Sequence, residues 1–117
     1  MKDLIRHGDL LFVPVKKTQV SEVEGLREVS GKVIERGEVT GHAHRVTEGD
    51  VTIEEHVRKS WQSGDMLPTG IRYMTVHTPA TVTHEEHKPV TLLPGLYEIM
   101  RAREFDYTAG LGRRVMD

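Results

Sequence analysis

The sequence predicts an all-β domain, a small barrel or sandwich of about seven or eight short antiparallel strands. Short runs rich in valine, isoleucine, threonine and aromatic residues alternate with polar residues, as in strands that bury one face. Glycines interrupt these runs at short intervals, and helical periodicity is absent. We expect the 117 residues to form one domain, with residues 101–117 as a C-terminal tail.

In the N-terminal part, a first strand is expected at residues 10–15, directly after the turn signal of Gly8 and Asp9. Residues 16–31 are polar and predict a loop with at most one short helical turn. Apolar and polar residues then alternate over residues 51–57, which predicts a longer strand.

In the C-terminal part, residues 59–70 carry two glycines and a proline and predict an exposed connection, with Trp61 as its one large anchor. Alternation over residues 71–76 predicts the next strand. The chain then continues as a meander, and its strands are expected at residues 80–84, 90–93 and 96–100.

Composition excludes several classes of protein. With 16 basic and 18 acidic residues the net charge is -2, so nucleic acid is not an expected partner. Cysteine is absent, so a metal ion would be held by nitrogen and oxygen atoms. No apolar run suits a membrane span or a leader, which predicts a cytoplasmic protein, or a virion-associated one if a phage encodes it. Hydrophobic residues make up 37%, a low share that favours self-association into a homo-oligomer.

Two pairs of histidines are the strongest functional signal. His42 and His44 are two residues apart, so on a strand both imidazoles point to the same side, with Cβ atoms roughly 6–7 Å apart. His84 and His87 lie in a turn before Pro89, and their spacing differs from that of the helical zinc-protease motif. We expect the two pairs to share one divalent metal ion.

Carboxylates near these pairs are the candidates for further roles. Glu38 and Glu86 are candidate general acids or bases beside a metal-bound water, and Glu48 is a candidate further ligand. Imidazole and carboxylate together suit zinc, iron, nickel or manganese. The remaining histidines are single and are expected on the surface or on strands without a ligand role: His7, His56 and His77.

Two resemblances follow from these motifs. The chain resembles a family of small uncharacterised bacterial and phage proteins, a likeness that spans nearly its whole length and implies no activity. The residues that carry it are 6–9, 37–44, 84–87, 94–97 and 101–105. His42, His44 and Glu48 are also similar to the first metal motif of the cupins, although no histidine follows Pro94 and Gly95 as a cupin would require. That similarity implies a metal ion held by three histidines and a glutamate in a β-barrel.

The predicted function is a metal-binding β protein with one mononuclear site, acting as a hydrolase or an oxygenase on a small molecule of unspecified class. A first alternative is a non-enzymatic structural or interaction protein, such as a phage capsid-decorating or assembly subunit. A second is a nucleic-acid or nucleotide-binding module that uses the basic residues of the tail, which are Arg101, Arg103, Arg113 and Arg114. The tail also offers Phe105 and Tyr107 as anchors, so we expect it to serve association more than catalysis.

Overall fold

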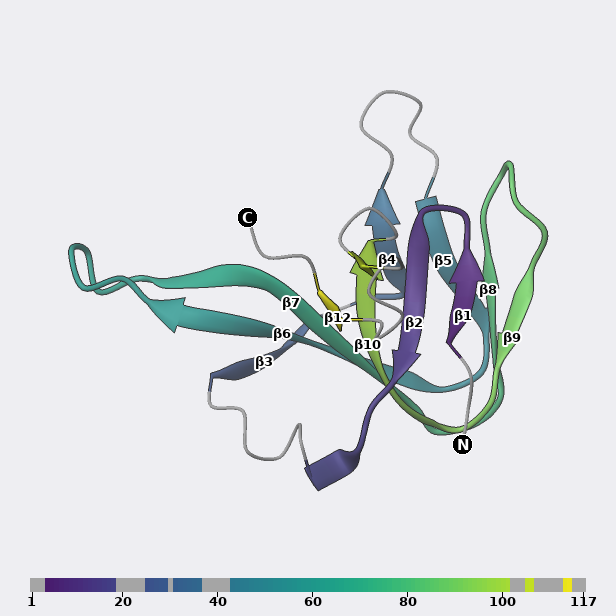
Figure 1. Ribbon diagram of the computed structural model, residues 1–117, viewed down its shortest axis with the longest axis horizontal. Helices are drawn as coiled ribbons and strands as arrows, with labels where there is room; N and C mark the ends of the chain where they lie inside the picture. The colour runs from purple at the N-terminus through teal and green to yellow at the C-terminus, as the bar shows by residue number, and fades with distance from the viewer. Residues whose placement is uncertain are drawn as a thin grey trace.

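The computed structural model describes residues 4–18, 25–29, 31–36, 43–101, 105–106 and 113–114. It confirms the all-β fold with antiparallel strands, and it shows two packed sheets of six and four strands rather than a closed barrel (Figure 1). The six-stranded sheet has the order β1 (Ile5–His7), β2 (Leu10–Pro14), β10 (Gly95–Arg101), β7 (Met66–Val76), β6 (Val51–Lys59) and β3 (Leu26–Val29). The four-stranded sheet has the order β4 (Val33–Arg36), β5 (Ala43–Glu48), β8 (Ala80–Thr83) and β9 (Val90–Leu92). Two short strands, β11 (Phe105–Asp106) and β12 (Arg113–Arg114), pair with each other.

The hydrophobic core lies between the two sheets. Alternation along each strand sends every second side chain inward, so Leu10 and Phe12 of β2 meet Val82 of β8 and Leu92 of β9 in one buried cluster. Leu11 is equally buried but belongs to a second, smaller cluster with Met100 on the opposite face of the six-stranded sheet. Within the described residues the two sheets share no strand pairing, so side-chain packing holds them together.

Residues 25–29 correct the sequence-based expectation of a loop. Leu26–Val29 forms β3 and pairs with β6, with Leu26 opposite His56 and Val29 opposite Ile53. Two of its four side chains are exposed, so the segment has little hydrophobic pattern, although each of its residues lies opposite a residue of β6. A helical turn occurs at Lys17 and Thr18, and residues 19–24 lie outside the described residues.

The connection expected at residues 59–70 is shorter than predicted. Strand β7 begins at Met66, so only residues 60–65 form the turn, and Pro68 and Gly70 lie within the strand. A strand accepts proline here because this part of β7 pairs with β6 alone. Trp61 was expected to anchor the connection, but it is 90% exposed and packs into no core.

Membrane-spanning helices are not found in the portion of the chain that the structure describes.

Adjacent leucines offer a direct test of where the core lies. Leu92 is 0% exposed and Leu93 is 59% exposed. Replacing Leu92 by alanine removes buried methyl groups and leaves a cavity, which should lower the free energy of unfolding by about 2–5 kcal/mol. Leu93→Ala should change it by no more than about 0.5 kcal/mol. Urea denaturation of both variants measures the difference, and equal losses would contradict the assignment of the core.

Candidate metal centre

Strand register brings His44 and His84 together. In the pairing of β5 with β8, Arg45 lies opposite Thr83 and Val46 opposite Val82. Continuing this antiparallel register by one residue places His44 opposite position 84, and the two rings are 4.5 Å apart between centroids. His44 shares its side of β5 with the core residue Val46, so its ring points between the sheets.

The turn after β8 adds His87. The backbone N–H of His87 donates to the carbonyl of His84, and the N–H of Glu86 donates to Nδ1 of His84 at 3.0 Å. This compact turn brings the rings of His84 and His87 to 4.8 Å. The side chain of Glu86 is exposed.

Glu85 fastens this turn to β5. One carboxylate oxygen accepts a hydrogen bond from the backbone N–H of Ala43 at 3.0 Å, and the other accepts one from Nη1 of Arg45 at 3.1 Å. These contacts, together with the N–H of Glu85 itself, lower the pKa of its carboxyl to about 2. Since both partners flank His44, Glu85 holds the turn in register with that ring.

His7 enters the same site from the other sheet. It ends β1, is 2% exposed, and lies with Nδ1 2.8 Å from Nδ1 of His44. Gly8 follows it with a φ of +61°, a left-handed conformation that glycine adopts without strain. A Cβ atom at position 8 would lie 2.6 Å from Nε2 of His87, so the close approach of that ring also requires glycine.

His7, His44, His84 and His87 therefore form a histidine cluster at the junction of the two sheets. The distances between ring centroids run from 4.5 Å for His44 and His84 to 6.4 Å for His7 and His84. His7 and His44 are buried, His84 is partly buried, and His87 is exposed. The cluster thus has a buried end and an end open to water.

Burial keeps the inner two rings neutral. It is the main reason that the pKa of His44 falls from 6.5 to about 4; the neighbouring histidines lower it further and Glu85 partly offsets them. The pKa of His7 is also lowered, mainly by burial, against a smaller opposite effect of the Lys88 backbone. A neutral imidazole has a free lone pair, which a proton would otherwise occupy, so both rings remain able to bind a metal ion in weakly acidic solution.

The nitrogens of the cluster do not all point at one place. Nδ1 of His7 and Nδ1 of His44 share a hydrogen bond. Nδ1 of His84 accepts a hydrogen bond from the Glu86 N–H, so a neutral His84 carries its proton on Nε2. Accordingly, no three acidic or histidine side chains of the described residues have the geometry to hold an ion as they stand. Nε2 of His7 is a buried nitrogen for which no hydrogen bond is found among the described residues, although the Lys88 backbone lies near enough to raise the pKa of its ring.

The structure brings together three of the predicted site residues, His44, His84 and His87. His42 and Glu38 lie outside the described residues. Glu48 is exposed and lies four residues along β5 from His44, roughly 13 Å away at about 3.3 Å per residue. His56 and His77 lie elsewhere and bond to threonines.

Sequence reasoning missed His7 and Glu85. His7 was expected without a ligand role, and it is the residue that joins the two sheets within the cluster. Its neighbour Gly8 carried a usable signal, since glycine directly after a histidine permits both a tight turn and a close approach of another ring. Glu85 gave no sequence signal that distinguished it from Glu86, because only the register of β5 with β8 selects it.

The fold and the cluster together define a β-sandwich domain with a histidine cluster between its sheets. Comparison of the sequence with protein families gives a match to the domain of unknown function DUF8820 over residues 6–102, and the chain belongs to this family. The match covers the whole histidine cluster and ends one residue after β10. It confirms the expected membership of an uncharacterised domain family. No curated protein and no solved structure matches the chain significantly.

The lowered pKa of His44 predicts how stability depends on pH when no metal is present. An unfolded His44 has a pKa of 6.5 and a folded one of about 4, so between these values protons bind preferentially to the unfolded chain. Stability should be full above pH 6.5 and should fall as the pH drops toward 4. Since one pKa unit corresponds to about 1.4 kcal/mol, the melting temperature should fall by several degrees.

Thermal unfolding in chelator-containing buffers from pH 7.5 to 4.5 measures this effect. Glu85 adds a pH dependence of its own only near the lower end, because its carboxyl has a pKa of 4.5 in the unfolded chain and about 2 in the folded one. His44→Asn keeps a polar atom near the position of Nδ1 and should flatten the pH response, whereas His77→Gln, at an exposed position, should leave it unchanged. A parent protein with the same melting temperature at pH 7 and pH 5 would contradict the lowered pKa values of His7 and His44.

Proposed function

We propose that the protein binds one divalent transition-metal ion through the histidine cluster. The single observation that carries the proposal is the convergence of four imidazoles from two sheets, with ring centroids no more than 6.4 Å apart. Neutral imidazole is a common ligand for zinc, iron and nickel, and the chain has no cysteine to compete. Manganese, which prefers oxygen, fits this donor set less well.

Two features of the cluster support a bound ion. Nε2 of His7 is a buried polar atom with no hydrogen bond of good geometry among the described residues, only the Lys88 backbone nearby, and a bound ion or water is one explanation for such an atom. Gly8 leaves room for the ring of His87 where any side chain would displace it, so the backbone is shaped around the imidazoles. Strand geometry alone would not require either feature.

Binding would need only a small rearrangement. Two nitrogens held by one tetrahedral zinc ion at about 2.0–2.1 Å lie roughly 3.3 Å apart. The Nδ1 atoms of His7 and His44 are 2.8 Å apart, so an ion could replace their hydrogen bond if the rings separated by roughly half an ångström. His84 would have to exchange its contact with the Glu86 N–H for the ion.

The exposed end of the cluster suits catalysis. If three histidines bind, the ion keeps a position for water or substrate near His87, and an ion of this kind supplies a Lewis acid that activates bound water. Glu86 is exposed beside that end and is the described carboxylate that we propose as a general base. This extends the proposal to a metal-dependent hydrolase or oxygenase acting on a small molecule.

The direct bond between His7 and His44 favours a second candidate function. A hydrogen-bonded pair that joins the two sheets without an ion would be a structural feature of a non-enzymatic interaction protein. The arginines at positions 113 and 114 belong to β12, and binding of nucleic acid by the tail stays a prediction.

Metal binding is tested by replacing cluster histidines in pairs. The double variant His44→Ala with His87→Ala removes one buried and one exposed ligand and should abolish binding of zinc and cobalt(II). An ion that binds only the folded state at a hundredfold excess over its dissociation constant adds about 2.7 kcal/mol, so chelator should lower the melting temperature of the parent but not of the variant. Elemental analysis should give one ion per parent chain.

The matched control is His56→Ala with His77→Ala, which removes two histidines outside the cluster and should leave metal content unchanged. The visible spectrum of the cobalt(II) form then separates a closed four-histidine site from one with an open position. A parent protein that contains no metal and whose melting temperature does not respond to chelator or to added zinc would contradict metal binding. The second candidate, a non-enzymatic interaction protein, would then remain.

A further inference from the structure

A β-hairpin arm projects from the sandwich. Among the described residues, β3 and the adjoining Gly25 pair with β6 as far as Val57, and β10 pairs with β7 only from Arg72 onward. Over residues 58–70 the described pairing is that of β6 with β7. Figure 1 shows this part of β6 and β7 reaching away from the two packed sheets. We call residues 58–70 the arm.

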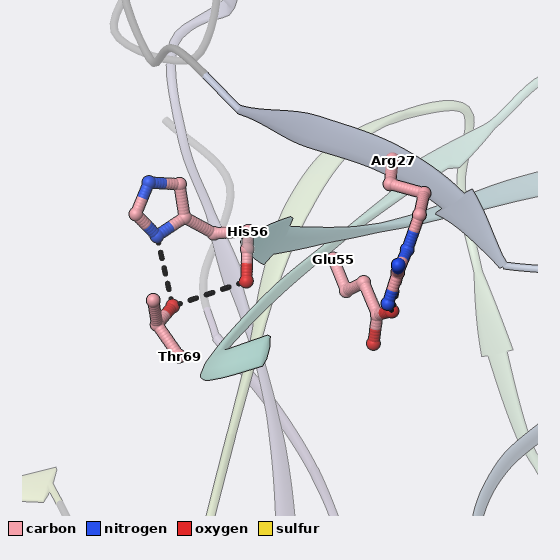
Figure 2. Close-up of polar contacts among 4 residues, drawn as sticks. All are labelled: Arg27, Glu55, His56 and Thr69. Carbon is pink, nitrogen blue, oxygen red and sulfur yellow. Dashed lines mark hydrogen bonds and ion pairs between the residues drawn. The ribbon is translucent and has the colours of Figure 1, made fainter. Parts of the chain in front are cut away.

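The arm is braced where it leaves the sheet. Figure 2 shows Arg27 of β3 in an ion pair with Glu55 of β6, and the ring of His56 bonded to the hydroxyl of Thr69 across β6 and β7. The Thr69 hydroxyl also donates to the carbonyl of His56. Between Glu55 and Val57 the pairing register shifts, and such an irregularity bends a hairpin in a defined direction.

The tip of the arm is a hydrogen-bonded turn with exposed apolar side chains on it and at the start of β7. The N–H of Ser60 donates to the carbonyl of Asp65, and the N–H of Gly64 to that of Ser60, which closes the turn. Trp61 lies on this turn and is 90% exposed, and Met66 and Leu67 at the start of β7 are exposed as well. A two-stranded hairpin gains little stability by itself in water, so an ordered arm with three exposed large apolar side chains fits a surface that another molecule covers.

Charges on the outer face of the six-stranded sheet indicate which molecule covers the tip of the arm. Strand register places Glu28 opposite Glu54, Glu54 opposite Tyr73, and Tyr73 opposite Glu98, in one row across four strands. Their sequence neighbours in the core point inward, so the row, which we call the acidic row, lies on the other face of the sheet. Glu28 is exposed there, and Glu54, Tyr73 and Glu98 are partly buried. Glu98 has a contact of its own, whereas Glu28 and Glu54 have no ion pair or hydrogen bond within the described chain.

The arm carries the complementary charge. Arg58 lies opposite Leu67 on one face of the arm, and both are exposed. Lys59, the next residue along β6, is also exposed but points to the other face. Two carboxylates directly opposite each other, as Glu28 and Glu54 are, destabilise a sheet unless a cation approaches them. Arg58 cannot be that cation within one chain, because it lies four residues farther along β6 from Glu54, roughly 13 Å away at about 3.3 Å per residue.

We propose that the arm of one copy docks on the acidic row of a second copy. Arg58 meets Glu28 and Glu54, while Trp61 and Leu67 pack on Tyr73. In a symmetric pair each copy both gives and receives an arm, so the same contact forms twice. The inference is independent of metal binding.

The test uses two oppositely charged variants. The arm variant is Arg58→Glu with Leu67→Ser, and the face variant is Glu28→Lys with Glu54→Lys. Sedimentation equilibrium in chelator should show concentration-dependent association of the parent and about tenfold or more weakening for each variant alone. An equimolar mixture should associate more tightly than either variant alone, because each arm then meets a face of opposite charge, although one of the two contacts still lacks Leu67. The control is Leu93→Ser, which removes an exposed leucine that lies on neither the arm nor the acidic row, and it should associate like the parent.

Trp61 is the only tryptophan, so its fluorescence reports coverage of the tip directly. Its emission should shift to the blue as the parent concentration rises and should stay unshifted in either variant, with far-UV circular dichroism confirming that both remain folded. A parent that is monomeric at all concentrations would overturn the proposal. So would variants that associate like the parent, a mixture that does not recover, or a shift that appears only with phosphatidylcholine and phosphatidylserine vesicles.

Discussion

The contact between His7 and His44 is the constraint on which the site depends. It joins an edge strand of the six-stranded sheet to the four-stranded sheet at a point where both rings are buried. Two charged imidazoles could not remain there, because each would lose its hydration and repel the other. The rings must therefore stay neutral, either joined to each other by a hydrogen bond or bound to a common ion. Both arrangements keep the sheets together, and they are alternatives at the same atoms.

The surrounding structure is arranged to keep this junction in place. Register sets His84 beside His44, Glu85 ties the following turn to β5 through a backbone and a side-chain contact, and Gly8 lets His87 approach. The cluster thus has a buried pair, His7 and His44, a partly buried His84 and an exposed His87. That gradient from buried to exposed suits an ion that enters from water and is retained by neutral ligands. It also separates the site from the arm, whose exposed tip and brace lie on strands of the six-stranded sheet that contribute no histidine to the cluster.

Much of the fold could be predicted because strand alternation is a local property of sequence. The strand at Val51–Lys59 was expected from it over residues 51–57, and the strand at Leu10–Pro14 was expected from strand-forming residues after a turn signal. Leu26–Val29 could not be predicted, since a half-exposed edge strand has little pattern of its own. In the same way His84 and His87 are close in sequence and were found, whereas His7 joins them only through the packing of one sheet on the other. Trp61 was misinterpreted because a large aromatic residue normally packs inward, and the sequence cannot show that it stands at the tip of a projecting hairpin.

Nitrogen-15 NMR of the histidine rings, recorded during a zinc titration, tests most directly whether the four imidazoles form one site. Before zinc is added, at pH 7, the rings of His7 and His44 should be neutral, with Nδ1 of one protonated and bonded to Nδ1 of the other. One equivalent of zinc should shift a nitrogen resonance of each of the four cluster rings together and leave those of His56 and His77 unchanged. Rings that respond independently of one another, or that ignore zinc and protonate near their ordinary pKa of about 6.5, would contradict the account.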